Sequence, residues 1–290
     1  MGYRPRHRAR SKGRILSVIL CLLLAALLAY PFVEPYLLEV ENVTLAYADF
    51  PENIGQLRIV YLSDIHRGPF FSEKRLRNLV TRVNSLSPDL ILLGGDYADT
   101  SEETLAFFRS APDFHARYLT AGVLGNHDRT QPESNLERIQ RAMYDAGIVP
   151  LVNGVARVKI GTEYIYLAGI DDVDNGWPDL ESVAAQTDRG DFVIFLSHSP
   201  AVLSKAMECK DRDGDRGWFD LALCGHTHGG QVTLLGQPVM KIAPTRTRYW
   251  RGWYEANRAR ILVSNGVGTS IAPIRLFAKP QIHLITLRRE

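Results

Sequence analysis

The sequence predicts an α/β fold for most of the chain, preceded by one membrane-spanning helix. From residue 57 onward, short runs rich in Val, Ile, Leu and Tyr alternate with amphipathic helical patterns, which is typical of α/β domains. Before them, residues 15–33 contain no charged side chain, and at about 1.5 Å per residue they would reach across a hydrocarbon core. With 290 residues, 46% hydrophobic and 23% charged, the chain can bury a sizeable core, which excludes a disordered, collagen-like or coiled-coil protein.

Residues 1–14 form a basic N-terminal arm with six Lys or Arg and no acid. A basic flank before an apolar span favours a cytoplasmic N-terminus, so the positive-inside rule places residues 34–290 outside the cytoplasm. Residues 15–33 could instead be a cleaved secretory signal or a buried core helix. The run is longer than a signal's apolar stretch, and its best cleavage site, after Ala29, has bulky Leu27 two positions earlier. We therefore expect a retained single-pass anchor in a bacterial inner membrane.

Charge and cysteine content narrow the function classes of the remaining residues. Removing the six bases of the arm from the 34 Lys and Arg leaves 28 against 32 Asp and Glu, a net charge of −4. The globular part is therefore not expected to bind nucleic acid. The spacings of Cys21, Cys209 and Cys224 predict neither a disulfide framework nor a thiolate metal site. Any chemistry must depend on His, Asp, Asn or Arg.

Six apolar runs predict the central strands of a domain at residues 57–290, because most of them are too continuous to have a solvated face. These runs are 57–62, 90–93, 118–124, 164–170, 192–196 and 221–224. After Gly225, strand-like segments alternate with turn residues and show no helical pattern; they are 231–242, 249–254, 261–265 and 282–287. Residues 34–56 are expected to form a stalk that leads into an edge strand.

Three helices are predicted between the strands. The first begins after Ser72, a typical N-cap residue, and its apolar side chains up to Val83 lie three or four residues apart. Residues 133–146 show the same spacing. Pro200, shortly after the fifth apolar run, suits the first turn of a third helix.

Polar residues follow five of the predicted strands at the points where the strands end. These residues are Asp64, His66, Asp96, Asn126, His127, Asp128, His198, His226 and His228. Because the carboxyl ends of sheet strands form the sites of open α/β folds, we expect them to meet. Singly, Asp64 or Asn126 could be a cap or turn residue, and His198 a core histidine. Jointly, carboxylate, amide and imidazole groups without sulfur indicate a pair of divalent transition metals.

The ordered set Asp-x-His, Gly-Asp, Gly-Asn-His-Asp, His and Gly-His-x-His resembles the calcineurin-like metallophosphoesterases over about residues 57–288. The resemblance implies a two-sheet sandwich flanked by helices, in four αββα layers. It also implies two divalent metal ions, with manganese as first choice and iron or zinc as alternatives. In the family pattern, one metal is held by Asp64, His66 and His228, the other by Asn126, His198 and His226, and Asp96 bridges both. By the same resemblance, His127 is the catalytic histidine and Asp128 orients its ring.

The implied metal pair would activate a water for in-line attack on phosphorus and neutralise charge on the phosphoryl oxygens. His127, beside the metal ligands but not among them, suits a general acid that protonates the leaving group. Arg67 and Arg129 each directly follow one of the strand-end segments. Their guanidinium groups could grip phosphoryl oxygens, and the alternative is that both are merely solvated.

Several segments indicate which branch of the family this sequence resembles. Residues 95–100 lack the Asp-Arg-Gly continuation of the Ser/Thr phosphoprotein phosphatases. Residues 226–231, 265–270 and 273–276 look like those of membrane-anchored bacterial phosphodiesterases, which include hydrolases of UDP-2,3-diacylglucosamine in lipid A synthesis. That substrate is made on the cytoplasmic face, whereas the charge pattern predicts this domain on the outer face. Residues 246–254 combine Arg, Trp and Tyr, which suits either a membrane interface or an edge strand with aromatics packed inward.

The sequence therefore predicts a membrane-anchored hydrolase of phosphodiester or pyrophosphate bonds. Its expected substrate is a phosphorylated, amphiphilic and lipid-linked small molecule. The alternatives are a broad small-molecule phosphodiesterase and a metal-stabilised, non-catalytic binding module. A protein partner cannot be inferred from the sequence pattern.

Overall fold

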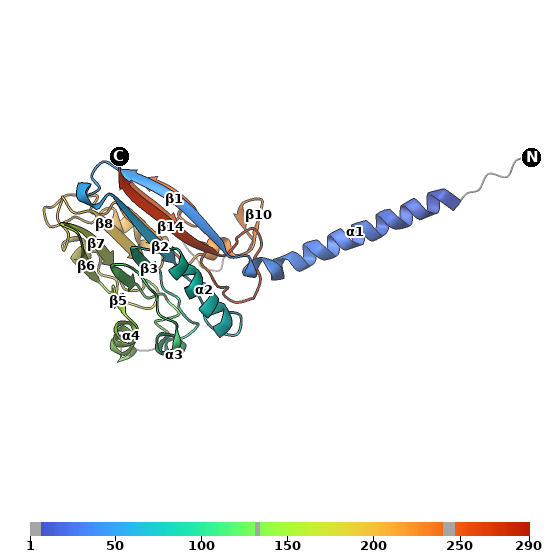
Figure 1. Cartoon of the computed structure of the whole chain (residues 1–290), viewed down its shortest axis with the longest axis horizontal. Coiled ribbons are helices and arrows are strands. Elements are labelled where there is room, and N and C mark those ends of the chain that lie inside the picture. Colours follow the sequence, from blue (N-terminus) through green and yellow to red (C-terminus); the bar gives the residue numbers. More distant parts are fainter. Residues whose placement is uncertain (1–6, 131–133, 240–246) are drawn as a thin grey trace, which may run out of the picture.

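The computed structural model describes residues 7–130, 134–239 and 247–290. Parts of four predicted segments lie outside these ranges: residues 1–6 of the basic arm, residue 133 of the second predicted helix, residues 240–242 of a predicted strand, and Arg246. Figure 1 shows helix α1 (His7–Val33) projecting away from a body in which strands form the interior layers.

The first large sheet has six strands in the order β1-β14-β2-β3-β4-β5. They are β1 (Glu39–Tyr47), β14 (Gln281–Arg289), β2 (Gln56–Leu62), β3 (Leu90–Leu93), β4 (Leu119–Gly122) and β5 (Ile148–Pro150). Strands β2 to β5 are mutually parallel, β14 is antiparallel to β2, and β1 lies at the edge, parallel to β14. The carboxyl ends of β2, β3 and β4 therefore open on the same edge of the sheet.

The second large sheet has six strands in the order β12-β13-β9-β8-β7-β6. They are β12 (Gly252–Ala256), β13 (Ala259–Val263), β9 (Leu221–Cys224), β8 (Val193–Ser197), β7 (Glu163–Gly169) and β6 (Gly154–Ile160). The four inner strands are parallel, and the two edge strands are antiparallel to their neighbours. A small separate hairpin is formed by β10 (Thr233–Leu234) and β11 (Gln237–Pro238).

Alternate strand residues face opposite layers, and this alternation builds three apolar clusters. Ile59 of β2 and Ile194 of β8 lie in the cluster between the two sheets. Their neighbours Val60 and Val193 face the helices that cover the outer sides. The first sheet is covered by α2 (Glu73–Ser85), α3 (Ser101–Ser110) and α4 (Ser134–Asp145), and the second by α5 (Leu180–Ala184) and α6 (Leu203–Ala206). The predicted two-sheet sandwich flanked by helices is confirmed.

Local signals account for several elements, including some that the sequence analysis missed. Ser72 caps α2, because its side chain accepts a hydrogen bond from Arg75 N. Helix α3 was not predicted, although Thr100 caps its start: the Thr100 side chain accepts a hydrogen bond from Glu103 N. The third predicted helix is short, a 3₁₀ turn η3 (Pro200–Val202) that leads into α6. The unpredicted β5 and β6 are short or half-solvated, so their apolar pattern is weak.

The aromatic segment near β12 packs inward. Tyr249 is 1% exposed and its ring meets Tyr254 edge-on. Trp253 packs against the apolar cluster between the sheets. Of the two interpretations that the sequence left open for this segment, the structure favours an edge strand with buried aromatics.

Helix α1 joins the body without a free stalk. Within the described residues, one helical stretch, Gly13–Tyr36, is long and apolar enough to cross a membrane, and its side chains are almost all exposed. It continues into the 3₁₀ turn η1 (Glu34–Tyr36), where the buried Glu34 carboxylate accepts hydrogen bonds from Phe277 N and Ala278 N. Strand β1 then pairs with β14 along its whole length. The segment 34–56, predicted as a stalk that leads into an edge strand, does contain an edge strand, β1, which belongs to the first sheet.

Candidate metal centre

The loops after β2, β3, β4, β8 and β9 meet at one edge of the two sheets. Asp64 N donates to Gly95 O (2.9 Å), which ties the loop after β2 to the loop after β3. Gly225 N donates to His198 O (2.9 Å), which ties the loops after β9 and β8. His226 N donates to the Asp64 carboxylate (2.9 Å) and so links the two sheets. The parallel strands thus bring residues distant in sequence to one place, as predicted.

One group of candidate ligands consists of Asp64, His66 and His228. The Nε2 atoms of His66 and His228 lie 3.2 Å apart, and Asp64 Oδ1 lies 3.5 Å from His228 Nε2. All three residues are at most 2% exposed. Their ligand atoms lie within 4.8 Å of one another, close enough for one metal ion to be held by all three residues.

A second group consists of Asp96, His198 and His226. His198 Nε2 lies 3.2 Å from His226 Nδ1 and 3.2 Å from Asp96 Oδ2. The same Asp96 oxygen lies 3.5 Å from His66 Nε2 of the first group. Asp96 therefore stands between the two groups, in the position that a bridging carboxylate requires.

Asn126 provides an independent observation that the site fits a metal. Its side-chain oxygen is buried and has no hydrogen-bond partner among the described residues. A buried polar atom without a partner is costly in a folded protein, and a cation supplies such a partner. The backbone of Asn126 is held in place, because its backbone carbonyl oxygen accepts a hydrogen bond from Asn175 Nδ2 (2.8 Å). The carboxylate, amide and imidazole donors together suit divalent transition metals.

The backbone at the site is strained. Five candidate ligands have a left-handed φ, which residues other than glycine rarely adopt: Asp64, His66, Asp96, His226 and His228. Such strain persists only where the surroundings enforce it, and it concentrates at functional sites. Gly125 permits the close approach of two loops here, because a Cβ at this position would overlap the Asp96 carboxylate.

Electrostatics divide the four histidines into two kinds. Burial lowers the pKa of His226 to about 4, aided by His198, and burial together with His66 and Arg275 holds the pKa of His228 well below its usual value. Burial also opposes the charged form of His198, yet Asp96 outweighs it and raises the pKa of His198 well above its usual value. The buried carboxylates thus attract positive charge, which a pair of cations would supply.

His127 lies beside the candidate ligands and is partly exposed. Its ring packs edge-on against His66, and its Nδ1 lies 3.1 Å from the carbonyl oxygen of Asp99. Its backbone N–H donates to Asp96 Oδ1 (3.0 Å). The ring is therefore near the centre of the site, with Nε2 left for another contact.

The prediction that Asp128 orients the His127 ring is wrong. The fully buried Asp128 carboxylate accepts hydrogen bonds from Gly125 N of its own loop, from Asp96 N and Tyr97 N of the loop after β3, and from the Thr104 hydroxyl of α3, at 2.7–3.1 Å. None of its described hydrogen bonds goes to the His127 ring. Burial, together with the charge of Asp96, raises the pKa of Asp128 to about 6. Its position indicates that it fixes the loops after β3 and β4 against each other.

Asp99 was missed by the sequence analysis, although it touches two site histidines. Its carboxylate lies 2.8 Å from His66 Nδ1, and its carbonyl oxygen is the partner of His127. A carboxylate on the outer nitrogen of a ligand histidine fixes the ring and its tautomer. The signal was present, since Asp99 follows Asp96 in the same strand-end loop.

The two arginines predicted to grip phosphate are both paired with carboxylates. Arg67 donates to Glu73 Oε2 of α2 at 3.1 and 3.3 Å. Arg129 is buried and donates to Asp171 Oδ2 at 3.0 Å. For either guanidinium to contact a substrate, its ion pair must open or be shared, so their role remains a prediction.

Two further groups near the site were not predicted as functional. Asp172, 1% exposed, follows strand β7, and its Oδ1 has no partner among the described residues. Arg275 is fully buried among backbone carbonyls, including Asn265 O (2.7 Å), and its Nη2 lies 3.5 Å from His228 Nδ1. Asp172 had the same strand-end signal as the candidate ligands, whereas the place of Arg275 depends on a long loop that the pattern does not fix.

A sequence model of the calcineurin-like phosphoesterases matches residues 57–230. The match covers more than half of the chain and contains all of the strand-end residues. This chain belongs to the calcineurin-like phosphoesterase family. The family membership, together with relatives named as phosphodiesterase or metallophosphoesterase, makes it a metal-dependent phosphoester hydrolase.

Similar members of the calcineurin-like phosphoesterase family occur in bacteria and animals. The uncharacterized metallophosphoesterase YkuE of Bacillus subtilis is 27% identical over 89% of this chain and 88% of its own length. Phosphodiesterase YaeI of Escherichia coli is 29% identical over 88% of this chain and 90% of its own. A transmembrane protein with metallophosphoesterase domain from Danio rerio is 28% identical over 87% of this chain, which spans 57% of that relative.

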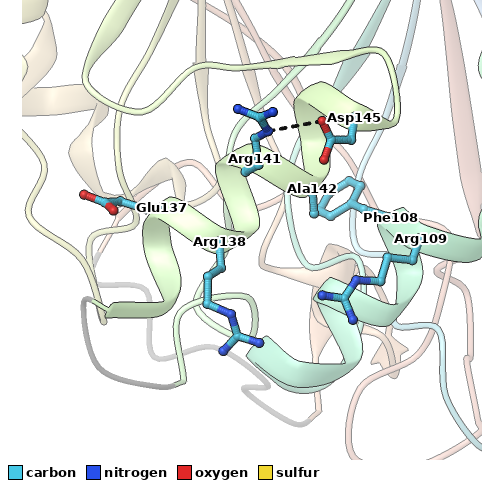
Figure 2. Close-up of a pocket in the computed structure, with 7 residues that line it drawn as sticks. All are labelled: Phe108, Arg109, Glu137, Arg138, Arg141, Ala142 and Asp145. Atoms are coloured by element: carbon cyan, nitrogen blue, oxygen red, sulfur yellow. Dashed lines mark ion pairs between the residues drawn. The ribbon is translucent and has the colours of Figure 1, made fainter.

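A surface hollow of about 580 Å³ lies elsewhere, between α3 and α4 (Figure 2). Its lining mixes bases and acids, and Arg141 Nε lies 3.3 Å from Asp145 Oδ1. It contains none of the candidate metal ligands. The hollow is therefore not part of the candidate metal centre.

Proposed function

We propose that this phosphoesterase is anchored in a membrane by α1 and hydrolyses a phosphodiester or pyrophosphate bond of a lipid-linked substrate. The observation that carries the reaction type is the position of Asp96, with one carboxylate oxygen 3.5 Å from His66 Nε2 and 3.2 Å from His198 Nε2. A carboxylate shared by two clusters of ligands suits a site for two cations. Two divalent ions in such a site activate a water and neutralise charge on phosphoryl oxygens.

We assign the remaining roles, which are metal binding, proton transfer and positioning, to residues of this chain. Asp64, His66 and His228 would hold one ion, Asn126, His198 and His226 the other, and Asp96 both. His127 is the general acid for the leaving group, since its Nδ1 is engaged by Asp99 O and its Nε2 can face a substrate. Asp99 orients His66, and Asp128 keeps the loops that carry Asp96 and Asn126 in register.

The substrate class rests on the anchor. An apolar helix that runs directly into the first sheet holds the site near a membrane, where amphiphilic phosphates are concentrated. UDP-2,3-diacylglucosamine is the specific candidate if the domain faces the cytoplasm, because residues 226–231, 265–270 and 273–276 resemble its hydrolases; on the outer face, another lipid-linked phosphate would take its place. We place the protein in a bacterial inner membrane with the domain outside the cytoplasm, from the basic flank of residues 1–14. Manganese is the first choice of metal, with iron or zinc as alternatives.

The full chain should hydrolyse bis(p-nitrophenyl) phosphate when supplied with a divalent transition metal. A chelator should abolish the activity, and added metal should restore it. Inactivity toward this diester under every metal would favour the non-catalytic binding module. Lipid and nucleotide-sugar profiles of cells with and without the protein would then separate a lipid-linked substrate, which should accumulate without the enzyme, from a broad set of soluble diesters.

Orientation has its own test. We expect the protein to stay with membranes after a salt wash and protease to reach the domain in intact spheroplasts. Protection of the domain until the membrane is ruptured would contradict the proposed orientation. That outcome would favour a substrate in the cytoplasmic leaflet, such as UDP-2,3-diacylglucosamine.

A further inference from the structure

Two loops lie beside the end of α1, on the side of the body from which the helix leaves (Figure 1). One is the β10–β11 hairpin, and the other is the segment 269–277. The loops are joined, because Thr233 N donates to Leu276 O at 2.8 Å. The second loop is also joined to α1, because Arg275 N donates to Pro31 O at 2.9 Å. Together they form one unit held against the end of the apolar helix.

This unit exposes large apolar side chains. We define the apolar rim as the five exposed residues Leu234, Leu235, Val239, Ile271 and Phe277, of which Leu235 is 94% and Ile271 72% exposed. Single exposed apolar residues are ordinary on a soluble protein. Five of them on two joined loops indicate a surface with a partner.

The backbone of the rim strengthens this argument. Leu235, Ile271 and Phe277 have φ of 51°, 64° and 54°, in the left-handed region. That region favours Gly, Asn and Asp, and a β-branched residue such as Ile271 is a marked exception. Leu235 precedes Gly236 in the two-residue turn of the hairpin, a place where Asn is preferred. In water, Asn or Gly would suit all three positions better than a bulky apolar residue.

We propose that the apolar rim inserts into the membrane interface around the end of α1, so that its partner is lipid. This inference rests on the membrane anchor of the proposed function. The rim continues the exposed apolar surface of α1, to which its loop is hydrogen-bonded. Arg251, whose Nη1 donates to Phe277 O (2.8 Å), puts a cation beside the rim, where it can attract anionic headgroups.

Insertion of the rim would also position the metal centre. The hairpin follows His228 closely in the chain, and the segment 269–277 follows Gly268, whose N–H donates to Asp64 O (2.6 Å). The hairpin is thus a direct extension of the segment that carries His228, and the segment 269–277 begins beside a hydrogen bond to the backbone of Asp64. A rim at the interface holds the site near headgroup level, which points to substrates with the scissile phosphate in a lipid headgroup.

The decisive measurement is fluorescence quenching of the full chain in nanodiscs of phosphatidylcholine and phosphatidylglycerol. In a Cys21→Ala background, Leu235→Cys is labelled with an environment-sensitive nitrobenzoxadiazole dye, and Tyr144→Cys on α4 serves as the matched control. Tyr144 is 58% exposed, and Figure 1 shows α4 far from α1. Lipids brominated on their acyl chains should quench the Leu235→Cys label by about half or more, because interfacial side chains reach the acyl boundary. The control should be unaffected.

Equal, weak quenching at both positions would overturn the proposal, since the rim would then lie in water. A label that is shielded from water but not quenched by brominated lipid would also overturn it, because protein, such as a second copy of the chain, would then cover the rim. The measurement needs no turnover. It therefore tests the rim even if the chain cleaves no diester, a result that would contradict the proposed function alone.

A second measurement links the rim to the reaction. The double variant Leu235→Ser with Ile271→Ser should hydrolyse soluble bis(p-nitrophenyl) phosphate within about twofold of the wild-type rate, because neither residue belongs to the metal centre. Its rate toward a fluorescent phosphodiester lipid in the same nanodiscs should fall about tenfold. Unchanged rates toward both substrates would contradict a role of the rim in presenting lipid to the site.

Discussion

The candidate metal centre and the apolar rim share a strained backbone but differ in everything that surrounds it. In the metal centre, the left-handed residues are polar and mostly buried: Asp64, His66, Asp96, His226 and His228. In the rim they are bulky, apolar and exposed: Leu235, Ile271 and Phe277. The unfavourable left-handed backbone conformation therefore occurs at both sites, in mostly buried polar residues at one and in exposed apolar residues at the other.

The two regions differ in the interactions that offset the cost of the left-handed backbone. In the metal centre, much of it lies within the protein, because Asp64 accepts from His226 N and Asp96 accepts from His127 N. The remaining carboxylate, amide and imidazole ligand atoms lie close together, and a cation would bind them. In the rim, the side chains face outward, so the compensation that we propose comes from lipid. We infer a functional surface in both regions from strained residues, and the chemistry of the side chains suggests the partner of each.

The largest expected effect comes from Asp96→Ala, which tests whether the metal centre depends on one shared carboxylate. Removing it should loosen both ions and abolish turnover of bis(p-nitrophenyl) phosphate, whereas His226→Ala should affect mainly one ion and leave more activity. Metal content per chain, measured with rates at increasing metal concentration, checks this. Near wild-type turnover of the Asp96 variant at ordinary metal supply would refute the bridge.

A smaller effect is expected from His127→Ala, because this residue acts on the substrate and not on the ions. The variant should keep its metals while kcat falls by about 10²- to 10⁴-fold, the usual range for a general acid. The loss should shrink for leaving groups that are weak bases. Loss of metal, or an equal loss for good and poor leaving groups, would contradict the assigned role.

How far sequence reasoning reaches differs between the two regions for a physical reason. The candidate ligands were found because strand ends are marked locally, by an apolar run followed by Gly, Asp, Asn or His, and parallel strands bring such ends together. The partner of His127 was assigned wrongly because loop direction decides whether a carboxylate meets a ring or a backbone N–H. Asp128 turns toward the amides of Gly125 and Asp96, and the carbonyl oxygen of Asp99 contacts the His127 ring.

The rim could not be predicted at all. Leu235, Ile271 and Phe277 are ordinary apolar letters in a sequence whose strands are full of them. Their exposure and φ depend on how the hairpin and the segment 269–277 pack against α1. The sequence did draw attention to residues 246–254 as a membrane surface, but Tyr249 is buried, and of this segment only Arg251 lies beside the rim that we propose.

Asp99→Ala tests the support of the metal centre and should have a moderate effect. Without the carboxylate 2.8 Å from its Nδ1, His66 loses its orientation, and metal affinity should fall by about 10- to 100-fold, as for other groups that orient ligand histidines. High metal concentration should restore most of the activity. Asp113→Ala, an exposed carboxylate outside the site, is the control and should bind metal normally. If the Asp99 variant bound metal with unchanged affinity, Asp99 would not be needed to orient His66. The metal and Asp96 would then be sufficient to hold the His66 ring.

The smallest expected effect is a gain in stability from Leu235→Asn, which tests whether the backbone of the rim is strained. Leu235→Asn places a residue that tolerates left-handed φ in the hairpin turn, so it should raise the free energy of unfolding in detergent by about 0.5–1 kcal/mol. Leu37→Asn is the matched control, because Leu37 is also exposed and lies near the end of α1, but has an ordinary φ of −90°. It should give no such gain. Denaturant unfolding of both variants measures the difference. If the Leu235 variant were no more stable than the control, the turn would not be strained, and backbone strain would not support a membrane role of the rim. If it is more stable yet loses its activity toward lipid in nanodiscs, the native Leu235 is retained at a cost in stability because it serves the membrane surface.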